Sequence, residues 1–359
     1  FPAHPVTMAK PRILISYFFG DDMIPLGYSC AEALRAMGHA VYCFNSQVES
    51  RVAGMTLKPV NRLARALGYK SREIGAQLPI ARENFKKTML KRAVSDFRPD
   101  WILVIRAHRF VDAELVAELK QDFGVQKVIG WRVDGPLDSP GLEEDAALYD
   151  AYFCIHRHGY DPASSGIRFL PVYGMDFSRY RNLYPAAPRP YRHDIAFVAG
   201  HNRRRMEYLE KLLHLPLEIY GKWGKASRFQ PALRRHIKAK GIWGEELVTL
   251  YNTTKIVLNI SGWDPALYGG LNMRTFDTPA TGAFLLTDYS PELEEYYEIG
   301  REIECFREAG ELADKLVYYL KNEAEREKIA CRGYEKALTL PTIGDRMKSV
   351  INLVASDGA

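Results

Sequence analysis

Short, predominantly apolar segments that alternate with amphipathic ones are the feature that most constrains the fold of this chain. Examples of the apolar segments are "PRILISYF" (11–18), "DWILVIRAH" (100–108) and "DIAFVAG" (194–200). Between such segments the apolar residues recur every three or four positions, as over 29–39, which is the spacing of a helix with one buried face. A strand without a polar face is typical of parallel sheets that are covered by helices on both sides. The sequence therefore predicts an α/β protein.

The stretch "RNLYPAAPRPYRHD" (181–194) contains three prolines and divides the alternating pattern into two series. We therefore predict two Rossmann-like domains, over 8–182 and 194–340, joined by a linker over 183–193. Ligands of such sheets bind at the carboxyl ends of the strands, so two facing domains would share one cleft between them. A chain of 359 residues is long enough for two cores of this kind.

Composition excludes several classes of protein. The net charge of +5 suits an anionic ligand or a membrane surface and is too small to indicate nucleic acid binding. The alternative is that this small excess of positive charge has no functional meaning. Five dispersed cysteines without a C-x-x-C pair indicate a reducing compartment rather than a zinc site. The leading "FPAHPVTM" lacks the regions of a signal peptide and is interpreted as a non-native remnant before Met8. The expected location is the cytoplasm, with peripheral membrane contact left open.

The stretch that begins at Gly269, "GGLNMRTFDTPATGAFLLTD", combines features of a nucleotide site. Gly269 and Gly270 would let the chain approach an anion before a helix begins. Arg274 adds a charge suited to phosphate oxygens, and Asp277, three residues later, could accept hydrogen bonds from a ribose diol. The alternative is an Arg–Asp surface pair on an amphipathic helix that ends at Gly282.

The same residues carry a resemblance to a known family. "NMRTFDTPATGAFLLTDYSPELEEYYEIGREIECF", together with "DIAFVAGHNRRRMEYLEKL" and "YNTTKIVLNI", resembles the C-terminal half of the CgeB-like (spore-maturation-type) glycosyltransferases, which are related to the group 1 glycosyltransferases of GT-B fold. The resemblance in sequence extends over about 194–350. In the first half of the chain only the predicted architecture resembles the family. It implies two Rossmann-like domains facing across a cleft, with a C-terminal helix over 341–359 that crosses back to the first domain.

The resemblance also implies roles for individual residues of the second domain. Asp277 would bind the ribose, Arg274 and Asn272 would lie near the diphosphate or donor sugar, and Arg205 matches an arginine of the family. Aromatic residues on two loops could hold the nucleobase. Solvated arginines and ordinary core aromatics are the alternatives. The donor-binding candidates are Gly200, Asn202, Arg205, Gly221, Lys222, Trp223, Trp243, Gly270, Asn272, Arg274 and Asp277.

One position departs from the family pattern. Group 1 enzymes often carry two glutamates eight positions apart, and here Gly269 stands at the first of these positions while Asp277 stands at the second. The donor sugar and the stereochemistry of transfer therefore stay open.

The first domain is expected to hold the acceptor. Three residues that follow its strands could act as general base: Asp22, His108 and Asp134. All three would lie at one edge of the sheet, and the sequence does not rank them. The alternatives are a turn-capping role for Asp22, a packed or loop position for His108, and a simple Asp-Gly-Pro turn at Asp134.

These observations predict a glycosyltransferase that moves a sugar from a nucleotide diphosphate sugar, taken to be of the UDP type, to a hydroxyl of a glycan, a lipid-linked glycan or a protein. No metal cofactor is expected, because arginines can neutralise the leaving diphosphate. The basic segments 62–72 and 86–92 could meet an anionic acceptor or a membrane, with a solvated basic face as the alternative. The rival functions are a nucleotide-sugar epimerase or hydrolase of the same fold and a non-catalytic nucleotide-sugar-binding or spore-coat protein.

Overall fold

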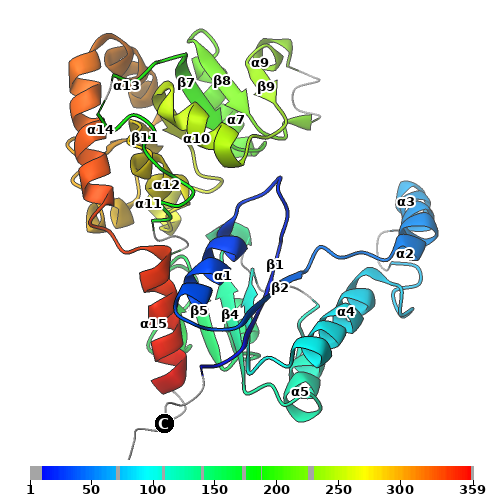
Figure 1. The fold of residues 1–359 in the computed structure, drawn as a ribbon. Coiled ribbons are helices and arrows are strands. Elements are labelled where there is room, and N and C mark those ends of the chain that lie inside the picture. The colour runs from blue at the N-terminus through cyan, green and yellow to red at the C-terminus, as the bar shows by residue number, and fades with distance from the viewer. Residues whose placement is uncertain are drawn as a thin grey trace, which may run out of the picture.

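The computed structural model describes residues 10–69, 73–106, 110–138, 141–171, 175–186, 188–224 and 230–356. These residues form two six-stranded sheets, each parallel throughout, with helices on both faces (Figure 1). The inner strands are wholly or largely buried, as their apolar sequences require, while the edge strands β2 and β9 are partly exposed.

The first sheet has the strand order β2-β1-β3-β4-β5-β6. Its strands are β1 (Ile13–Tyr17), β2 (Val41–Asn45), β3 (Trp101–Ile105), β4 (Lys127–Arg132), β5 (Ala151–Cys154) and β6 (Ile167–Phe169). The helices around it are α1 (Leu26–Ala36), α2 (Arg51–Met55), α3 (Leu57–Ala66), α4 (Arg82–Phe97), α5 (Ala113–Gln121) and α6 (Leu142–Ala146), with a 3-10 turn η1 (Pro136–Asp138). Alternate residues of β1 face opposite cores: Ile13 and Ile15 pack with α1, and Leu14 packs with α4 and α5.

The second sheet has the strand order β12-β11-β10-β7-β8-β9. Its strands are β7 (His193–Val198), β8 (Leu217–Tyr220), β9 (Ile237–Ala239), β10 (Thr254–Asn259), β11 (Leu285–Asp288) and β12 (Glu304–Phe306). Its helices are α7 (Arg203–Leu209), α9 (Pro231–Arg234), α10 (Gly244–Asn252), α11 (Pro265–Tyr268), α12 (Arg274–Ala280), α13 (Ala309–Lys321) and α14 (Glu323–Ala337), with 3-10 turns η2 (Glu210–Leu212) and η3 (Pro291–Glu295).

The last helix, α15 (Ile343–Ser356), returns to the first domain and lies against α1 (Figure 1). Met347, Val350 and Val354 are buried in the same core as Leu26 and Cys30 of α1. This confirms the predicted return of the C-terminal helix. The fold of two facing Rossmann-like domains was likewise predicted correctly.

The chain crosses between the domains twice, and the two crossings pair with each other. The backbone N–H of Met175 donates to the carbonyl of Pro341 over 3.0 Å, and the N–H of Ile343 donates back to the carbonyl of Met175 over 3.2 Å. The next residue, Asp176, accepts a hydrogen bond from the hydroxyl of Ser29 on α1. The hinge between the domains is therefore held by backbone and side-chain hydrogen bonds.

The stretch 269–288, which is predicted to form a nucleotide site, folds largely as expected, except that its helix begins only at Arg274. Helix α12 begins at Arg274, so Asn272 precedes it and accepts a hydrogen bond from the backbone N–H of Arg274 over 3.1 Å. The helix ends before Gly282, which adopts a positive φ of 70°, and the buried strand β11 follows. The short strand β9 lies in a segment whose sequence predicts only a basic connection.

In the part of the chain that the structure describes, no helix is both long and apolar enough to cross a membrane.

Candidate active site

A cavity of about 380 Å³ lies between the two domains, at the carboxyl ends of strands from both sheets. The first domain contributes a wall that follows β1 and β3, with Tyr17, Phe18, Asp22 and Arg106 among its residues. The second domain contributes residues that follow β7, β8 and β9 together with the start of α12. This is the position that strand topology predicts for a ligand site.

Half of the fourteen predicted site residues meet in this cavity although they come from distant parts of the sequence. The predicted residues that line it are Asp22, Gly200, Gly221, Lys222, Trp243, Arg274 and Asp277. These seven residues come from four loops and from helix α12.

Asp277 is a buried carboxyl at the cavity wall, only 4% exposed. Burial raises its pKa well above the usual range, and the nearby charge of Asp176 raises it further. Arg274 and a hydrogen bond from the hydroxyl of Tyr180 oppose this rise. Asp176 and Tyr180 come from the first interdomain crossing, so the hinge itself contributes to the surroundings of Asp277.

Two arginines near the cavity lack an acidic partner. Arg205 donates to the carbonyl oxygens of Ile260 (2.9 Å) and Gly200 (3.0 Å), and Arg274 donates to side-chain oxygens of Asn259 and Asn272 at 3.5 Å. Among the described residues, neither guanidinium has a carboxylate within ion-pair distance. Burial lowers the pKa of Arg205 to about 9, and the positive charge of Arg274 adds to this effect. Two neighbouring, partly buried cations of this kind favour an anion between them.

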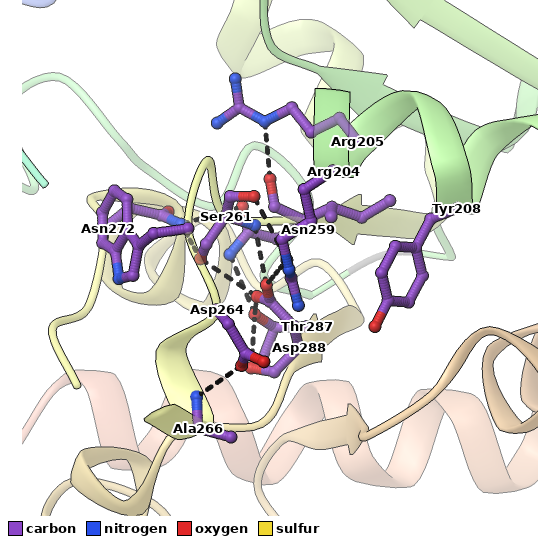
Figure 2. Close-up of polar contacts among 12 residues, drawn as sticks. Arg204, Arg205, Tyr208, Asn259, Ser261, Asp264, Ala266, Asn272, Thr287 and Asp288 are labelled. Atoms are coloured by element: carbon purple, nitrogen blue, oxygen red, sulfur yellow. Dashed lines mark hydrogen bonds and ion pairs between the residues drawn. The ribbon is translucent and has the colours of Figure 1, made fainter. Parts of the chain in front are cut away.

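A polar network holds the loops around these arginines (Figure 2). The carboxylate of Asp288, at the end of β11, accepts from Arg204 (2.6 Å) and from the backbone N–H (2.8 Å) and hydroxyl (3.1 Å) of Ser261. Asn272 donates to Ser261 (3.2 Å) and to Asn259 (3.1 Å). Burial raises the pKa of Asp288, and Arg204 opposes the rise. Arg204 and Asn272 therefore support the site from beneath the cavity.

Gly221 lets the backbone segments that follow β7 and β8 lie close together at the cavity. A Cβ at Gly221 would overlap the carbonyl oxygen of Ala199, so no other residue fits this crossing of the loops. Lys222 then extends into the cavity from the surface, and Lys240 joins it from the end of β9. The loop after β9 adds Ile242 and Trp243, whose apolar surfaces form a slot beside Tyr220.

Gly269 occupies a position that is strained for any residue with a side chain. Its φ is +65°, and a Cβ there would lie 3.0 Å from the carboxylate Oε1 of Glu292, a residue of η3. Burial raises the pKa of Glu292, while the backbone N–H of Gly270 donates to it and opposes the rise. A carboxylate from another element thus already lies beside position 269. Gly270 packs against His156 and Trp263 and does not line the cavity.

The three candidate bases of the first domain have different surroundings. Asp22 is exposed and lines the cavity. Asp134 pairs with Arg106 over 2.8 Å and approaches Arg132 at 3.8 Å; burial raises its pKa, and these arginines oppose the rise. His108 lies outside the residues that the structure describes. Arg106, which lines the cavity, has a φ of +78°, an unusual conformation for a residue with a side chain.

Five predicted donor residues do not line the cavity: Arg205, Gly270, Asn272, Trp223 and Asn202. Trp223 is buried in the core and donates from Nε1 to the carbonyl of Ala199 over 3.0 Å, so a predicted contact between Trp223 and the base does not match its position. Asn202 caps α7 through the backbone N–H of Arg204. The sequence patterns did not single out Tyr180, Tyr251 or Lys240, which line the cavity. The sequence offers one indication of these residues, which is that each lies close to the predicted interdomain linker or to the end of a strand.

No cluster of three or more metal-binding side chains occurs among the described residues.

A comparison with known protein families finds a match in the second half of the chain. Residues 203–352 match the profile of the family described as "Glycosyl transferase-like". This region includes α7, the Arg204–Asp288 network, α12 and most of α15. No curated protein matches the sequence.

Solved structures share the arrangement of both domains. Sucrose-phosphate synthase from Thermosynechococcus elongatus matches with a TM-score of 0.65 at 13% identity, covering 97% of this chain and 100% of that one. HepE from Anabaena, in complex with UDP-glucose, matches with a TM-score of 0.64 at 10% identity, with the same coverage. A glycosyltransferase from Rickettsia africae matches with a TM-score of 0.60 at 10% identity, covering 97% and 98%. At these identities the likeness shows the fold alone.

The chain therefore has the GT-B fold, and its second half carries a glycosyl transferase-like domain.

The buried carboxyl of Asp277 predicts a pH-dependent stability difference. Its pKa in the folded protein lies above the ordinary aspartate value of 3.8, so the folded state holds a proton that the unfolded state has released, and stability falls as pH rises through this window. Asn at position 277 cannot ionise. We expect the free energy of unfolding of Asp277→Asn, relative to the parent protein, to rise with pH above 3.8 by up to about 1.4 kcal/mol per pH unit.

Urea unfolding of the ligand-free protein over a pH series measures this difference. The variant Asp314→Asn, which removes an exposed carboxyl of α13, serves as the matched control. A rise with pH for Asp277→Asn no larger than that of the control would contradict the burial argument.

Proposed function

We propose that this protein is a glycosyltransferase that moves a sugar from a UDP-type nucleotide sugar to an acceptor hydroxyl in the interdomain cavity. The observation that carries the proposal is that Asp277 and Arg274 line the second-domain side of that cavity and that Arg205 lies close to Arg274. A carboxylate and two cations that have no acidic partner among the described residues complement a ribose diol and a diphosphate.

The donor would lie along the second domain. Asp277 would accept hydrogen bonds from the two ribose hydroxyls, which favours its ionised form. Arg274 and Arg205 would hold the diphosphate, with Lys222 as a third cation at the cavity wall. The slot of Tyr220, Ile242 and Trp243 offers apolar surface for the plane of the base. Gly200 and Gly221 leave room for the nucleotide backbone.

The same cations would serve the chemical step. Transfer breaks the bond between the anomeric carbon of the sugar and an oxygen of the diphosphate, and negative charge develops on that leaving group. Arg274 and Arg205 would stabilise this charge from a fixed and partly buried position. On this proposal a metal ion is not required, because protein cations take its electrostatic role.

The acceptor would approach from the first domain. Asp22 is the carboxylate on that wall of the cavity and would take the proton from the attacking hydroxyl. Asp134 is paired with Arg106 and would instead position that guanidinium at the wall. We therefore assign the base role to Asp22 among the described candidates.

A UDP-type donor has support from one structural relative. HepE shares the fold and was solved with UDP-glucose. In this chain, Asp277 and the cations near it suit a diphosphate donor of this class.

Removal of Arg205 should weaken the binding of the diphosphate and leave the nucleoside unaffected. Charged hydrogen bonds contribute about 1.5–3 kcal/mol, so Arg205→Ala should bind UDP roughly 10- to 100-fold more weakly by calorimetry, with uridine affinity unchanged. Arg203→Ala is the matched control, because Arg203 lies on the same helix with its side chain 94% exposed. Equal losses for UDP and uridine would mean that Arg205 only supports the fold.

Asp22→Asn should lower the turnover of a UDP-sugar by about 10²- to 10⁴-fold while UDP still binds, because only proton transfer is lost. Asp21→Asn, at the neighbouring exposed position, is the control. The measurement combines thermal shift with a panel of nucleotide sugars, assay of free nucleotide, and sugar analysis, with and without alcohol acceptors.

The panel separates the rival functions. Acceptor-dependent nucleotide release supports a transferase, release without an acceptor indicates a hydrolase, and sugar isomerisation without release indicates an epimerase. Stabilisation without any turnover would favour a non-catalytic binding protein. Absence of stabilisation by every nucleotide would contradict all of these functions.

A further inference from the structure

The segment formed by α2 and α3, residues 50–69, stands apart from the sheet of the first domain (Figure 1). We call it the α2–α3 arm. Several large apolar side chains of the arm are exposed, including Met55 (73%), Leu63 (62%) and Leu67 (68%). Exposed apolar residues that gather on one element of a monomer usually mark an interaction surface.

The arm has a fixed orientation because one of its faces is held by the chain that follows it. The side chain of Asn61 accepts from the backbone N–H of Ile74 (2.7 Å) and donates to its carbonyl (3.1 Å). Leu57, one turn earlier, packs beside Gly75. Leu63 and Leu67 are also one turn apart, but they lie on a different side of α3 and remain uncovered. The apolar surface is therefore presented outward by the fold.

Charge distinguishes this surface from an ordinary protein contact. Residues 50–72 include six basic residues and no acidic residue. On α3, Lys58, Arg62 and Arg65 follow a helical spacing that places them on one face, largely opposite the face of Leu63 and Leu67. Lys58 pairs with Glu49 at the base of the arm, while Arg62 has no partner among the described residues. A helix with one apolar face and one basic face is the pattern of a helix that lies in the surface of an anionic membrane.

The position of the arm relative to the cavities agrees with this assignment. A cavity at the base of the arm shares Glu73, Ala76, Ala81 and Arg82 with a larger one of about 670 Å³. The larger cavity in turn shares Phe18 and Gln47 with the interdomain cavity. Neighbouring hollows thus lead from the arm toward the first-domain side of the candidate active site.

We propose that the α2–α3 arm docks the protein on anionic phospholipid membranes, with Leu63, Leu67 and Met55 entering the interface and Arg62 and Arg65 contacting lipid phosphates. The inference rests on the surface of the arm and not on sugar transfer, so each can fail without the other. If both hold, the first domain would face acceptors held in or on the membrane.

The test is co-sedimentation of the purified protein with vesicles of phosphatidylcholine and phosphatidylglycerol in equal parts, compared with phosphatidylcholine alone. We expect binding to the anionic vesicles that weakens as salt is added, because the charge attraction is screened. Leu63→Ser with Leu67→Ser should reduce binding by about 100-fold, and Arg62→Gln with Arg65→Gln by about 30-fold at low salt.

The control is Leu338→Ser, which changes an exposed leucine (54%) at the end of α14, far from the arm, and should leave binding unchanged. All exchanged side chains of the apolar variants are exposed, so folding should be preserved and can be checked by thermal unfolding. Failure of the parent protein to bind anionic vesicles would overturn the proposal, as would unchanged binding by the leucine variant. Sedimentation equilibrium gives a further outcome: a dimer lost in the leucine variant would mean that a second copy covers the arm.

Discussion

The ion pair between Arg204 and Asp288 is the interaction on which the candidate site depends. Asp288 ends a buried strand, and its carboxylate accepts hydrogen bonds from Arg204 and from the backbone N–H and hydroxyl of Ser261. The hydroxyl of Ser261 in turn accepts a hydrogen bond from Asn272. Because this carboxylate pairs directly with Arg204, it acts on the next residue, Arg205, only at longer range. Helix α7 thus presents two successive arginines in different surroundings: Arg204 fixes the loops, and Arg205 is the one that we propose binds an anion.

The site is charged in a way that costs stability unless a ligand is bound. Arg205 and Arg274 repel each other, and Asp277 is buried beside another carboxylate, Asp176. A nucleotide diphosphate would relieve both conflicts, since its phosphates pair with the arginines and its ribose hydroxyls donate to Asp277. Such uncompensated groups in a cavity are typical of a binding site, where stability is given up for recognition.

Much of the fold could be predicted from the sequence because buried parallel strands are locally apolar and their helices are locally amphipathic. The resemblance of the second half added Asp277 and Arg274, which the structure places at the cavity. Burial was harder to predict: Trp223 follows a strand just as Trp243 follows another, yet only Trp243 lines the cavity. Tyr180 and Asp176 escaped prediction because they reach Asp277 only through the docking of the two domains. The carboxylate of Glu292 beside Gly269 is likewise a long-range contact that no local pattern encodes.

The central claim is that the second-domain side of the interdomain cavity binds a nucleotide diphosphate. Hydrogen–deuterium exchange of the protein with and without UDP tests it most directly, because it locates the ligand without requiring an acceptor. The account predicts slower exchange in the loop after β7, the loop before α10 and the segment that leads into α12. Protection confined to the first domain, or unchanged exchange in all three segments at saturating UDP, would contradict it.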